Sequence, residues 1–389
     1  MRVTKIELQS EGDARAAVSR VGADAYSVRR MSRKAFMVPL LISEIDNRAA
    51  NIIKQEILAC GGEAAVSRDV AAFKQGKSHV LVMATPAQYE RLLPKLAQQP
   101  FGLRDVGVSI VAELSRHASL SEKSPRVMGI LNVTPDSFSG DGRFHDSAAV
   151  VEYAFTMIKD GADIIDVGGE SSRPGARAVT AEEEQRRVVP VIQLLRKKTK
   201  KLISIDTCKP SVAQAALDAG ADIINDITGL RHQNGAMALV AARAKVPLVI
   251  MHMQGTPRTM QKNPRYADVV ADVYAFFEER IAFALAHGIA MKHIILDPGI
   301  GFGKTTEHNV TLLRRLNEFS SLGCPLMVGA SRKAFIGAVT GVSHPADRVT
   351  GSVAACLWAV NHGAAIVRVH DVKETCTALK ITGALSLWN

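Results

Sequence analysis

Short apolar runs alternate with longer stretches of mixed polar and apolar residues from residue 126 onward. Eight runs are rich in Ile, Val and Leu and are almost continuously apolar, which is typical of strands buried on both faces of a parallel sheet. The stretches between them have the amphipathic pattern of helices. The predicted strands are Arg126–Thr134, Ala162–Gly169, Leu202–Thr207, Asp222–Thr228, Pro247–Met253, His293–Ile300, Pro325–Ala330 and Ala364–Asp371.

Two long helices in this region carry end signals. Thr180 precedes the predicted helix Ala181–Thr199, and Glu183 follows three residues later, which is the capping-box pattern. Gly288 ends the second predicted helix, Tyr266–His287. Eight strand–helix units in about 260 residues match a parallel (β/α)8 barrel in count and size, and an eight-stranded doubly wound sheet is the alternative.

Polar residues end nearly every predicted strand, and their placement separates these two folds. Side chains at the carboxyl ends of many strands converge only if the sheet closes, and barrel enzymes place their active sites on that face. The predicted fold is therefore of the α/β class, a parallel (β/α)8 TIM barrel. The strand-end residues are Asn132, Asp166, Asp206, Asn225, Asp226, His252, Asp297, Ser331, Arg368 and His370.

Residues 1–115 follow a mixed pattern without an obvious motif, and we expect a small α+β domain of unknown role. The polar segment Leu114–Pro125 contains Ser and Pro and is typical of a linker, which we place at residues 116–125. The barrel domain then covers residues 126–389. The predicted N-terminal elements are the strands Thr4–Leu8, Ala35–Ile42 and His79–Met83 and the helices Asp46–Cys60 and Pro86–Ala97.

Composition narrows the function. The 389-residue chain is 47% hydrophobic and 22% charged, which excludes a disordered protein. Its net charge is +10, but the basic residues form no concentrated arm and aromatic residues make up only 5%. A nucleic-acid surface would cluster positive charge and supply aromatics for stacking, so small anionic substrates are the better interpretation.

The sequence also suggests where the protein works. No apolar stretch reaches the length of a membrane helix, and the N-terminus lacks the apolar core of a secretory signal. The five cysteines are odd in number, scattered and never spaced as CxxC, which argues against a disulfide framework or a zinc site. We therefore expect a cytoplasmic protein without nucleic-acid or membrane partners.

Two segments have the composition of active-site loops. Thr134–Phe144 is rich in Pro, Ser, Asp and Gly, and such loops close over barrel sites and exclude water. The next loop, Glu170–Ala176, contains Arg173, whose guanidinium could bind an anion at the same face. The alternatives are an ordinary strand–helix connection for the first loop and a solvated charge for Arg173.

Eight motifs occur in order over about residues 126–385, namely NVTPDSFS, DVGGESSRPGA, ISIDT, INDITG, MHMQGTP, LDPGIGFGK, GASRKAFIG and RVHDV. Together they resemble the motifs of the dihydropteroate synthase family of folate biosynthesis. The N-terminal region lies outside the usual catalytic core of that family, although some bacterial members carry a similar extension.

The resemblance implies a transferase that condenses 6-hydroxymethyl-7,8-dihydropterin pyrophosphate with p-aminobenzoate to give 7,8-dihydropteroate and pyrophosphate. It further implies Mg2+ as cofactor, a homodimer formed through the last barrel helices, and competition between sulfonamides and p-aminobenzoate. A chemically silent pterin-binding protein and a pterin-dependent methyltransferase are the alternatives. The methyltransferase would need neither the lid NVTPDSFS nor a diphosphate-binding arginine.

A pterin edge presents amino, ring N–H and oxo groups, which carboxylates, an amide and a cation can recognise. A single buried carboxylate could equally be a helix cap or a local salt bridge. Two carboxylates and a lysine at one barrel mouth are hard to explain by packing, because buried charge is costly unless paired. The residues that resemble the family's pterin-binding set are Asp206, Asn225, Asp297 and Lys333, with Met251 packing against the ring.

The other two ligand groups have matching residues. Arg368 and His370 resemble the family's diphosphate clamp, and Asn132 resembles the residue that helps hold Mg2+ and the diphosphate. We leave His252 without a role. The residues expected around p-aminobenzoate are Phe302, Pro174 and the Lys333 stem as flat or apolar faces, Ser331 at a helix start for the carboxylate, and Phe138 and Ser172 from the two loops. Arg173 is also expected among the substrate-binding residues, with an anion-binding or lid role.

The expected mechanism relies on preorganised charge, and the residues expected to act in it are Asp206, Lys333 and Arg368. Pyrophosphate is a good leaving group once Mg2+ and Arg368 neutralise it, and the aniline nitrogen needs little activation. We therefore expect dissociative C–O cleavage through a pterin cation that Asp206 stabilises.

Overall fold

The computed structural model describes residues 1–8, 10–120, 124–134, 147–171 and 179–386. The chain divides into two compact units, Met1–Glu122 and Lys123–Asn389. Each unit encloses a hydrophobic core of its own, and the boundary falls between residues 116 and 125.

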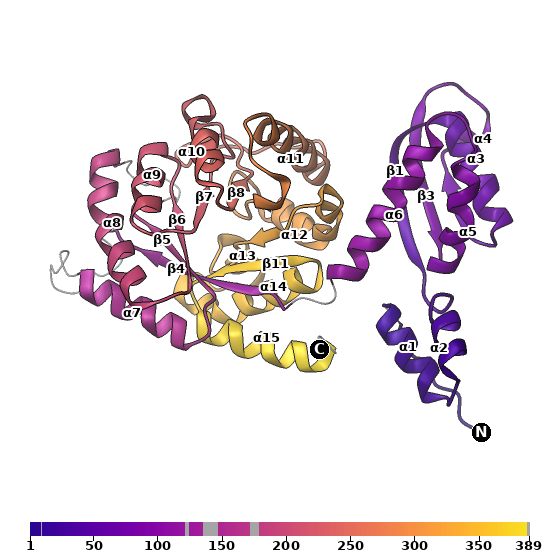
Figure 1. Cartoon of the computed structure of the whole chain (residues 1–389), viewed down its shortest axis with the longest axis horizontal. Coiled ribbons are helices and arrows are strands. Elements are labelled where there is room, and N and C mark those ends of the chain that lie inside the picture. Colours follow the sequence, from indigo (N-terminus) through magenta and orange to yellow (C-terminus); the bar gives the residue numbers. More distant parts are fainter. Residues whose placement is uncertain (9, 121–123, 135–146, 172–178, 387–389) are drawn as a thin grey trace. The chain divides into compact units, whose positions relative to one another are not determined.

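The N-terminal unit is built on a three-stranded antiparallel sheet with the order β1–β3–β2, of which Figure 1 labels β1 and β3. Residues along the central strand alternate between buried and exposed, and Val80 and Val82 share a core with Ile53 of α3 and Leu92 of α5. The elements are α1 Glu11–Arg20, α2 Ala25–Ser32, β1 Val38–Asp46, α3 Asn47–Ala59, β2 Glu63–Val66, α4 Arg68–Ala71, β3 Lys77–Ala84, α5 Pro86–Leu96 and α6 Leu103–Leu120.

Sequence-based prediction is partly wrong in this unit. The strand predicted at Thr4–Leu8 does not form, since residues 1–8 have no regular structure and Ile6 is 56% exposed. Apolar alternation alone does not make a strand when no neighbouring strand pairs with it. The predicted strand Ala35–Ile42 corresponds to β1, which begins later and continues to Asp46.

Helix α6 is absent from the predicted elements, and it extends into the segment expected to be a linker. Its buried positions Leu103 and Ile110 are seven residues apart and lie on one face of the helix. The polar composition of the last turns hides this stripe in the sequence. The first residues of the expected linker are therefore helical.

The second unit is a closed barrel of parallel strands surrounded by helices (Figure 1). The order of the strands around the barrel is β10–β11–β4–β5–β6–β7–β8–β9. This confirms the predicted fold, and every predicted barrel strand corresponds to one observed strand. The strands are β4 Arg126–Asn132, β5 Ile164–Gly168, β6 Leu202–Asp206, β7 Ile223–Asp226, β8 Leu248–Met251, β9 Ile294–Asp297, β10 Leu326–Val328 and β11 Ala364–Val369.

Helices surround the barrel, and side-chain caps set where two of them begin. Thr180 caps α8 by accepting a hydrogen bond from the Glu183 N–H. Helix α11 begins three residues later than predicted, because Asp268 caps it by accepting from two backbone N–H groups. The helices are α7 Ser147–Lys159, α8 Ala181–Lys198, α9 Pro210–Asp218, α10 Ala236–Ala244, α11 Val269–Ala286, α12 Thr306–Arg314, α13 Ala334–Thr340, α14 Val349–Asn361 and α15 Val372–Ser386.

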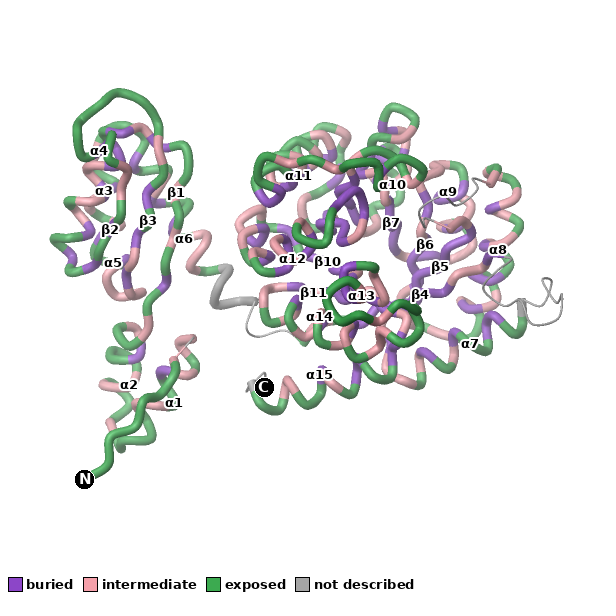
Figure 2. Tube along the Cα trace, turned by 180° about the vertical axis from the view of Figure 1, so that it is seen from behind, coloured by how far each residue is buried: buried purple, intermediate pink, exposed green. Residues whose placement is uncertain are grey.

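The barrel strands are largely buried on both faces (Figure 2). Outward-facing side chains pack against the helices, and inward-facing side chains fill the barrel near the amino ends of the strands. Closer to the carboxyl ends, inward positions become polar, so the apolar interior supports a polar site above it. The inner apolar cluster is Met128, Ile164, Ile223, Val249, Ile295, Met327 and Ile366. Within the described part of the chain, no helix is both long and apolar enough to cross a membrane.

Candidate active site

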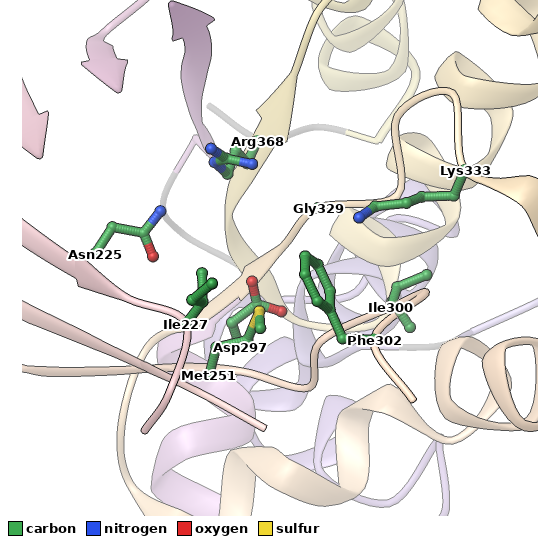
Figure 3. Close-up of a pocket in the computed structure, with 9 residues that line it drawn as sticks. All are labelled: Asn225, Ile227, Met251, Asp297, Ile300, Phe302, Gly329, Lys333 and Arg368. Carbon is green, nitrogen blue, oxygen red and sulfur yellow. The ribbon is translucent and has the colours of Figure 1, made fainter. Parts of the chain in front are cut away.

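A pocket opens at the carboxyl ends of the strands from β7 to β11 (Figure 3). Six residues predicted for the site line it, and the structure adds Ile227, Ile300 and Gly329, which carry no polar side chain for a sequence argument to detect. The six predicted residues are Asn225, Met251, Asp297, Phe302, Lys333 and Arg368.

Arg368 is held by two carboxylates on neighbouring strands. Its Nε donates to Asp166 Oδ2 and its Nη2 donates to Asp206 Oδ2, each at 2.6 Å. Asn225 Nδ2 also donates to Asp166 Oδ2, at 3.1 Å. Asp166 is fully buried, and Arg368 and Asp206 are 17% and 11% exposed. This ion-pair cluster makes Asp166 part of the site, a role that its place at a strand end suggests but does not specify.

The cluster has unusual electrostatics because two carboxylates share one guanidinium. Burial raises the pKa of Asp206 to about 7; the Arg368 cation opposes this change and Asp166 adds to it. Burial lowers the pKa of Arg368, but Asp166 and Asp206 raise it above its ordinary value, so the guanidinium stays charged. Asp206 is thus a carboxyl whose charge changes near neutral pH.

Asp297 ends β9 and lies beside Met251 and Phe302 in the pocket (Figure 3). It is 4% exposed, and burial raises its pKa although the Gly299 N–H donates to its Oδ1 at 2.8 Å. Gly299 has a φ of +67°, and a Cβ there would lie 2.0 Å from the His252 carbonyl oxygen. Glycine at this position is therefore required for the loop that carries Phe302 to cross the end of β8.

Lys333 reaches the pocket from the loop after β10. Its Nζ lies 4.1 Å from the centre of the Phe302 ring, a cation–π contact that places an ammonium beside a flat apolar face. The Lys333 stem passes close to Gly301, where a Cβ would be 3.0 Å from Lys333 Cδ. The ammonium and the aromatic ring border one side of the same pocket.

His252, which the sequence leaves without a role, belongs to a buried cluster that contacts the loop after β9, which carries Phe302. Lys304 Nζ lies 2.9 Å from His252 Nδ1 and donates to the carbonyl oxygens of His252 and Phe302 at 3.3 and 3.1 Å. Burial lowers the pKa of Lys304 to about 7 and that of His252 to about 2. This cluster fixes the backbone that presents Phe302.

Ser331 and His370 contact each other. Ser331 Oγ lies 3.1 Å from His370 Nδ1, and the His370 N–H donates to Ser331 Oγ at 3.2 Å. The sequence places Ser331 at a helix start, whereas helix α13 begins three residues later, at Ala334. The turn at Arg332, whose φ is +58°, delays the helix.

Asn132 ends β4, across Gly168 of β5 from Asp206. A Cβ on Gly168 would lie 3.6 Å from Asn132 Oδ1 and 3.8 Å from Asp206 Oδ2, so both oxygens border the space that glycine leaves open. Among the residues that the structure describes, no group of three His, Cys, Asp or Glu side chains could hold a metal ion. The predicted loop residues Phe138, Ser172, Arg173 and Pro174 lie outside the described residues.

Fold and pocket together define a class, the parallel barrel enzymes whose site lies at the carboxyl ends of the strands. The sequence model of the family described as "Pterin binding enzyme" matches residues 128–370. The dihydropteroate synthase of Escherichia coli is 48% identical over 266 residues, which cover 68% of this chain and 93% of that protein. The structure of the Xanthomonas albilineans dihydropteroate synthase with 4-aminobenzoic acid is 49% identical, has a TM-score of 0.64, and is matched over 68% of this chain and 93% of that one.

The chain belongs to the dihydropteroate synthase family and has the activity for which that family is named. A third relative includes the N-terminal unit in its match. The probable bifunctional folylpolyglutamate synthase/dihydropteroate synthase of Haloferax volcanii is 39% identical over 95% of this chain, which spans 46% of that longer protein.

Proposed function

We propose that the pocket at the carboxyl ends of β7–β11 condenses 6-hydroxymethyl-7,8-dihydropterin pyrophosphate with p-aminobenzoate. The observation that supports this most strongly is the convergence of Asn225, Asp297 and Lys333 with Arg368 around one pocket. Acceptors for a pterin edge and a cation for a diphosphate thus lie within the same site. The membership of the chain in the family supports the same reaction.

The pterin occupies the pocket with its polar edge toward Asp297 and Asn225. The Asp297 carboxylate accepts from pterin N–H groups, and Asn225, held by Asp166, offers an amide that can donate and accept. The Lys333 ammonium donates to a pterin acceptor, and Met251 packs against the ring. Because these groups are fixed before the substrate arrives, recognition needs little rearrangement.

The diphosphate lies toward Arg368 and His370 at the end of β11. The pairs with Asp166 and Asp206 hold the guanidinium in place, and this cation stabilises the charge of the departing pyrophosphate. The C–O bond breaks first and leaves a pterin cation, which the Asp206 carboxylate stabilises. The amine of p-aminobenzoate then attacks the methylene carbon of this cation and releases one proton to solvent, so the reaction needs no protein nucleophile.

The donor set at the barrel mouth fits Mg2+, which prefers oxygen ligands. Asn132 Oδ1 would hold the ion together with diphosphate oxygens, and the ion when bound adds positive charge beside the leaving group. We further propose that the aromatic ring of p-aminobenzoate packs against Phe302 and the Lys333 stem. Sulfonamides, which share its aniline group, would then compete for the same place.

The location of the protein in the cell and its oligomeric state are also proposals. We place the protein in the cytoplasm, where its five free cysteines would remain reduced. We also propose a homodimer that pairs through the last barrel helices. Sedimentation equilibrium of the full chain tests the dimer.

Pyrophosphate release tests the proposed reaction. The full chain with Mg2+ should release pyrophosphate and form dihydropteroate when both substrates are present, and Lys333→Met should lose this activity. Sulfonamide inhibition should be relieved by excess p-aminobenzoate. Pterin binding without product would instead indicate a binding protein, and methyl transfer from methyltetrahydrofolate to a corrinoid would indicate the methyltransferase.

A further inference from the structure

Arg332 has a left-handed backbone conformation in the turn between β10 and α13. Its φ is +58°, in a region that glycine adopts readily and arginine rarely. Its neighbours are Ser331, which contacts His370, and Lys333, which lines the pocket. Strained residues of this kind persist only where the surroundings hold them, and they concentrate at functional sites.

The polar backbone groups of Arg332 are both bound by side chains near the start of α14. The Arg332 N–H donates to Ser352 Oγ at 2.8 Å, and Ser352 Oγ donates to the Arg348 carbonyl at 2.7 Å. The Arg332 carbonyl accepts from Arg348 Nη1 at 3.1 Å. The two hydrogen bonds of Arg332 join the strained turn to α14, and the bond between Ser352 and Arg348 orients the Ser352 hydroxyl.

The side chain of Arg332 forms a bidentate ion pair with Asp371, directly after β11. Arg332 Nε donates to Asp371 Oδ2 at 3.0 Å, and Nη2 donates to Oδ1. Asp371 is 8% exposed, and its carbonyl accepts from the N–H and the hydroxyl of Thr375 in the first turn of α15. The carboxylate is therefore fixed on a rigid element, and the paired geometry orients the guanidinium.

We propose that Arg332 and Asp371 are positioning residues that direct the Lys333 side chain into the pterin pocket. The φ of Arg332 sets the direction of the chain that follows, and therefore where the Lys333 stem begins. The ion pair and the contact between Ser331 and His370 join the same two loops, so they fix the Lys333 loop relative to the end of β11. The proposal rests on the proposed function, in which Lys333 binds the pterin.

An ordinary structural ion pair is the competing explanation, because the Arg332 side chain is 31% exposed. Such a pair would affect the stability of the barrel without acting specifically through Lys333. The two explanations differ in one measurable respect, which is whether the effect on pterin binding disappears when the Lys333 ammonium is already absent.

Calorimetric titration with 6-hydroxymethyl-7,8-dihydropterin, which carries no phosphates, is the decisive measurement. Arg332→Met and Asp371→Asn should each weaken its binding on the order of tenfold, and the double variant should be no weaker than the singles. In a Lys333→Met background the same substitutions should change binding less than about twofold. Arg332→Lys should recover part of the loss, because it retains a cation opposite Asp371.

Arg315→Met is the matched control, since Arg315 also pairs with carboxylates, those of Asp268 and Glu318, but lies outside the turn that carries Lys333. It should leave pterin binding unchanged. If Arg332→Met does not fold, the isosteric Asp371→Asn carries the test. Equal losses with and without the Lys333 ammonium, or no loss in a folded Asp371→Asn variant, would overturn the proposal. Failure of the parent chain to bind the pterin would instead refute the proposed function.

Discussion

Replacing Arg368 with methionine removes the cation from a buried group of charges and should destabilise the barrel in a pH-dependent way. Asp166 and Asp206 each accept a 2.6 Å hydrogen bond from this guanidinium. The Asp166 side chain is fully buried, and in the variant its Oδ2 keeps only the Asn225 amide as a hydrogen-bond partner. Among the described residues, none hydrogen-bonds its Oδ1. Two negative charges would then face each other with no cation between them.

The magnitude follows from this burial. Removing one partner of a buried ion pair typically costs about 3–5 kcal/mol, because an uncompensated charge remains in a poorly solvated place. We expect that loss in the free energy of unfolding at about pH 8. At lower pH the Asp206 carboxyl group of the variant takes up a proton, and the loss of unfolding free energy should become smaller.

The direction with pH follows from proton linkage. Burial and the Asp166 carboxylate raise the pKa of Asp206 above 3.8, its ordinary value, and in the variant no Arg368 cation opposes this change. Between 3.8 and the raised pKa of Asp206, the folded variant binds more protons than the unfolded state, so its stability falls as pH rises through that window. The parent retains the Arg368 cation, which opposes the rise in pKa, so its stability should fall less over the same pH range. The difference between parent and variant therefore grows with pH.

Urea unfolding followed by tryptophan fluorescence measures this difference in the barrel, because Trp358 and Trp388 both belong to the second unit. Arg315→Met is the matched control; its side chain is 35% exposed, and its pairs with Asp268 and Glu318 are both partly exposed, so each should contribute less than about 1 kcal/mol at any pH. The reasoning would be refuted if Arg368→Met lowers the free energy of unfolding by no more than the control does, or if this loss grows as pH falls.

Three further predictions concern activity. Asp206→Asn should lower kcat by about a hundredfold with little change in KM. It should also abolish the rise of kcat/KM that accompanies loss of the Asp206 proton near neutral pH. An effect confined to KM would contradict this prediction. Asp297→Ala should weaken binding of the pterin and of its diphosphate by a similar factor in calorimetry, while pyrophosphate binding stays nearly unchanged. A chain that starts at Lys123 should fold and turn over both substrates, because the barrel alone matches 93% of the Escherichia coli relative; a folded but inactive product would place part of the site in the N-terminal unit.

The barrel could be predicted because the same local pattern, an apolar run followed by an amphipathic stretch, repeats eight times along the chain. Each strand is a nearly continuous apolar run, and the polar residue at its end, such as Asp297 at the end of β9, lies at the mouth of the barrel once the sheet closes. Strand position therefore places these polar residues at one mouth of the barrel, and the resemblance to a known family supplies their expected roles in ligand binding. The N-terminal strand predicted at Thr4–Leu8 failed for the complementary reason, because a strand needs a partner that a single segment cannot specify.

The amino-acid sequence by itself thus determined the barrel, its polar face and most of the residues that line the pocket. Tertiary structure alone decided how these residues are paired. Arg368 is some two hundred residues from Asp166, and their hydrogen bond exists because β11 closes the barrel beside β4. Likewise, nothing local reveals that Arg332 adopts a left-handed turn, since its hydrogen bonds to Ser352 and Asp371 come from later elements. Sequence periodicity reports burial and strand position, whereas charge pairing and strain depend on distances that appear only when remote segments pack together.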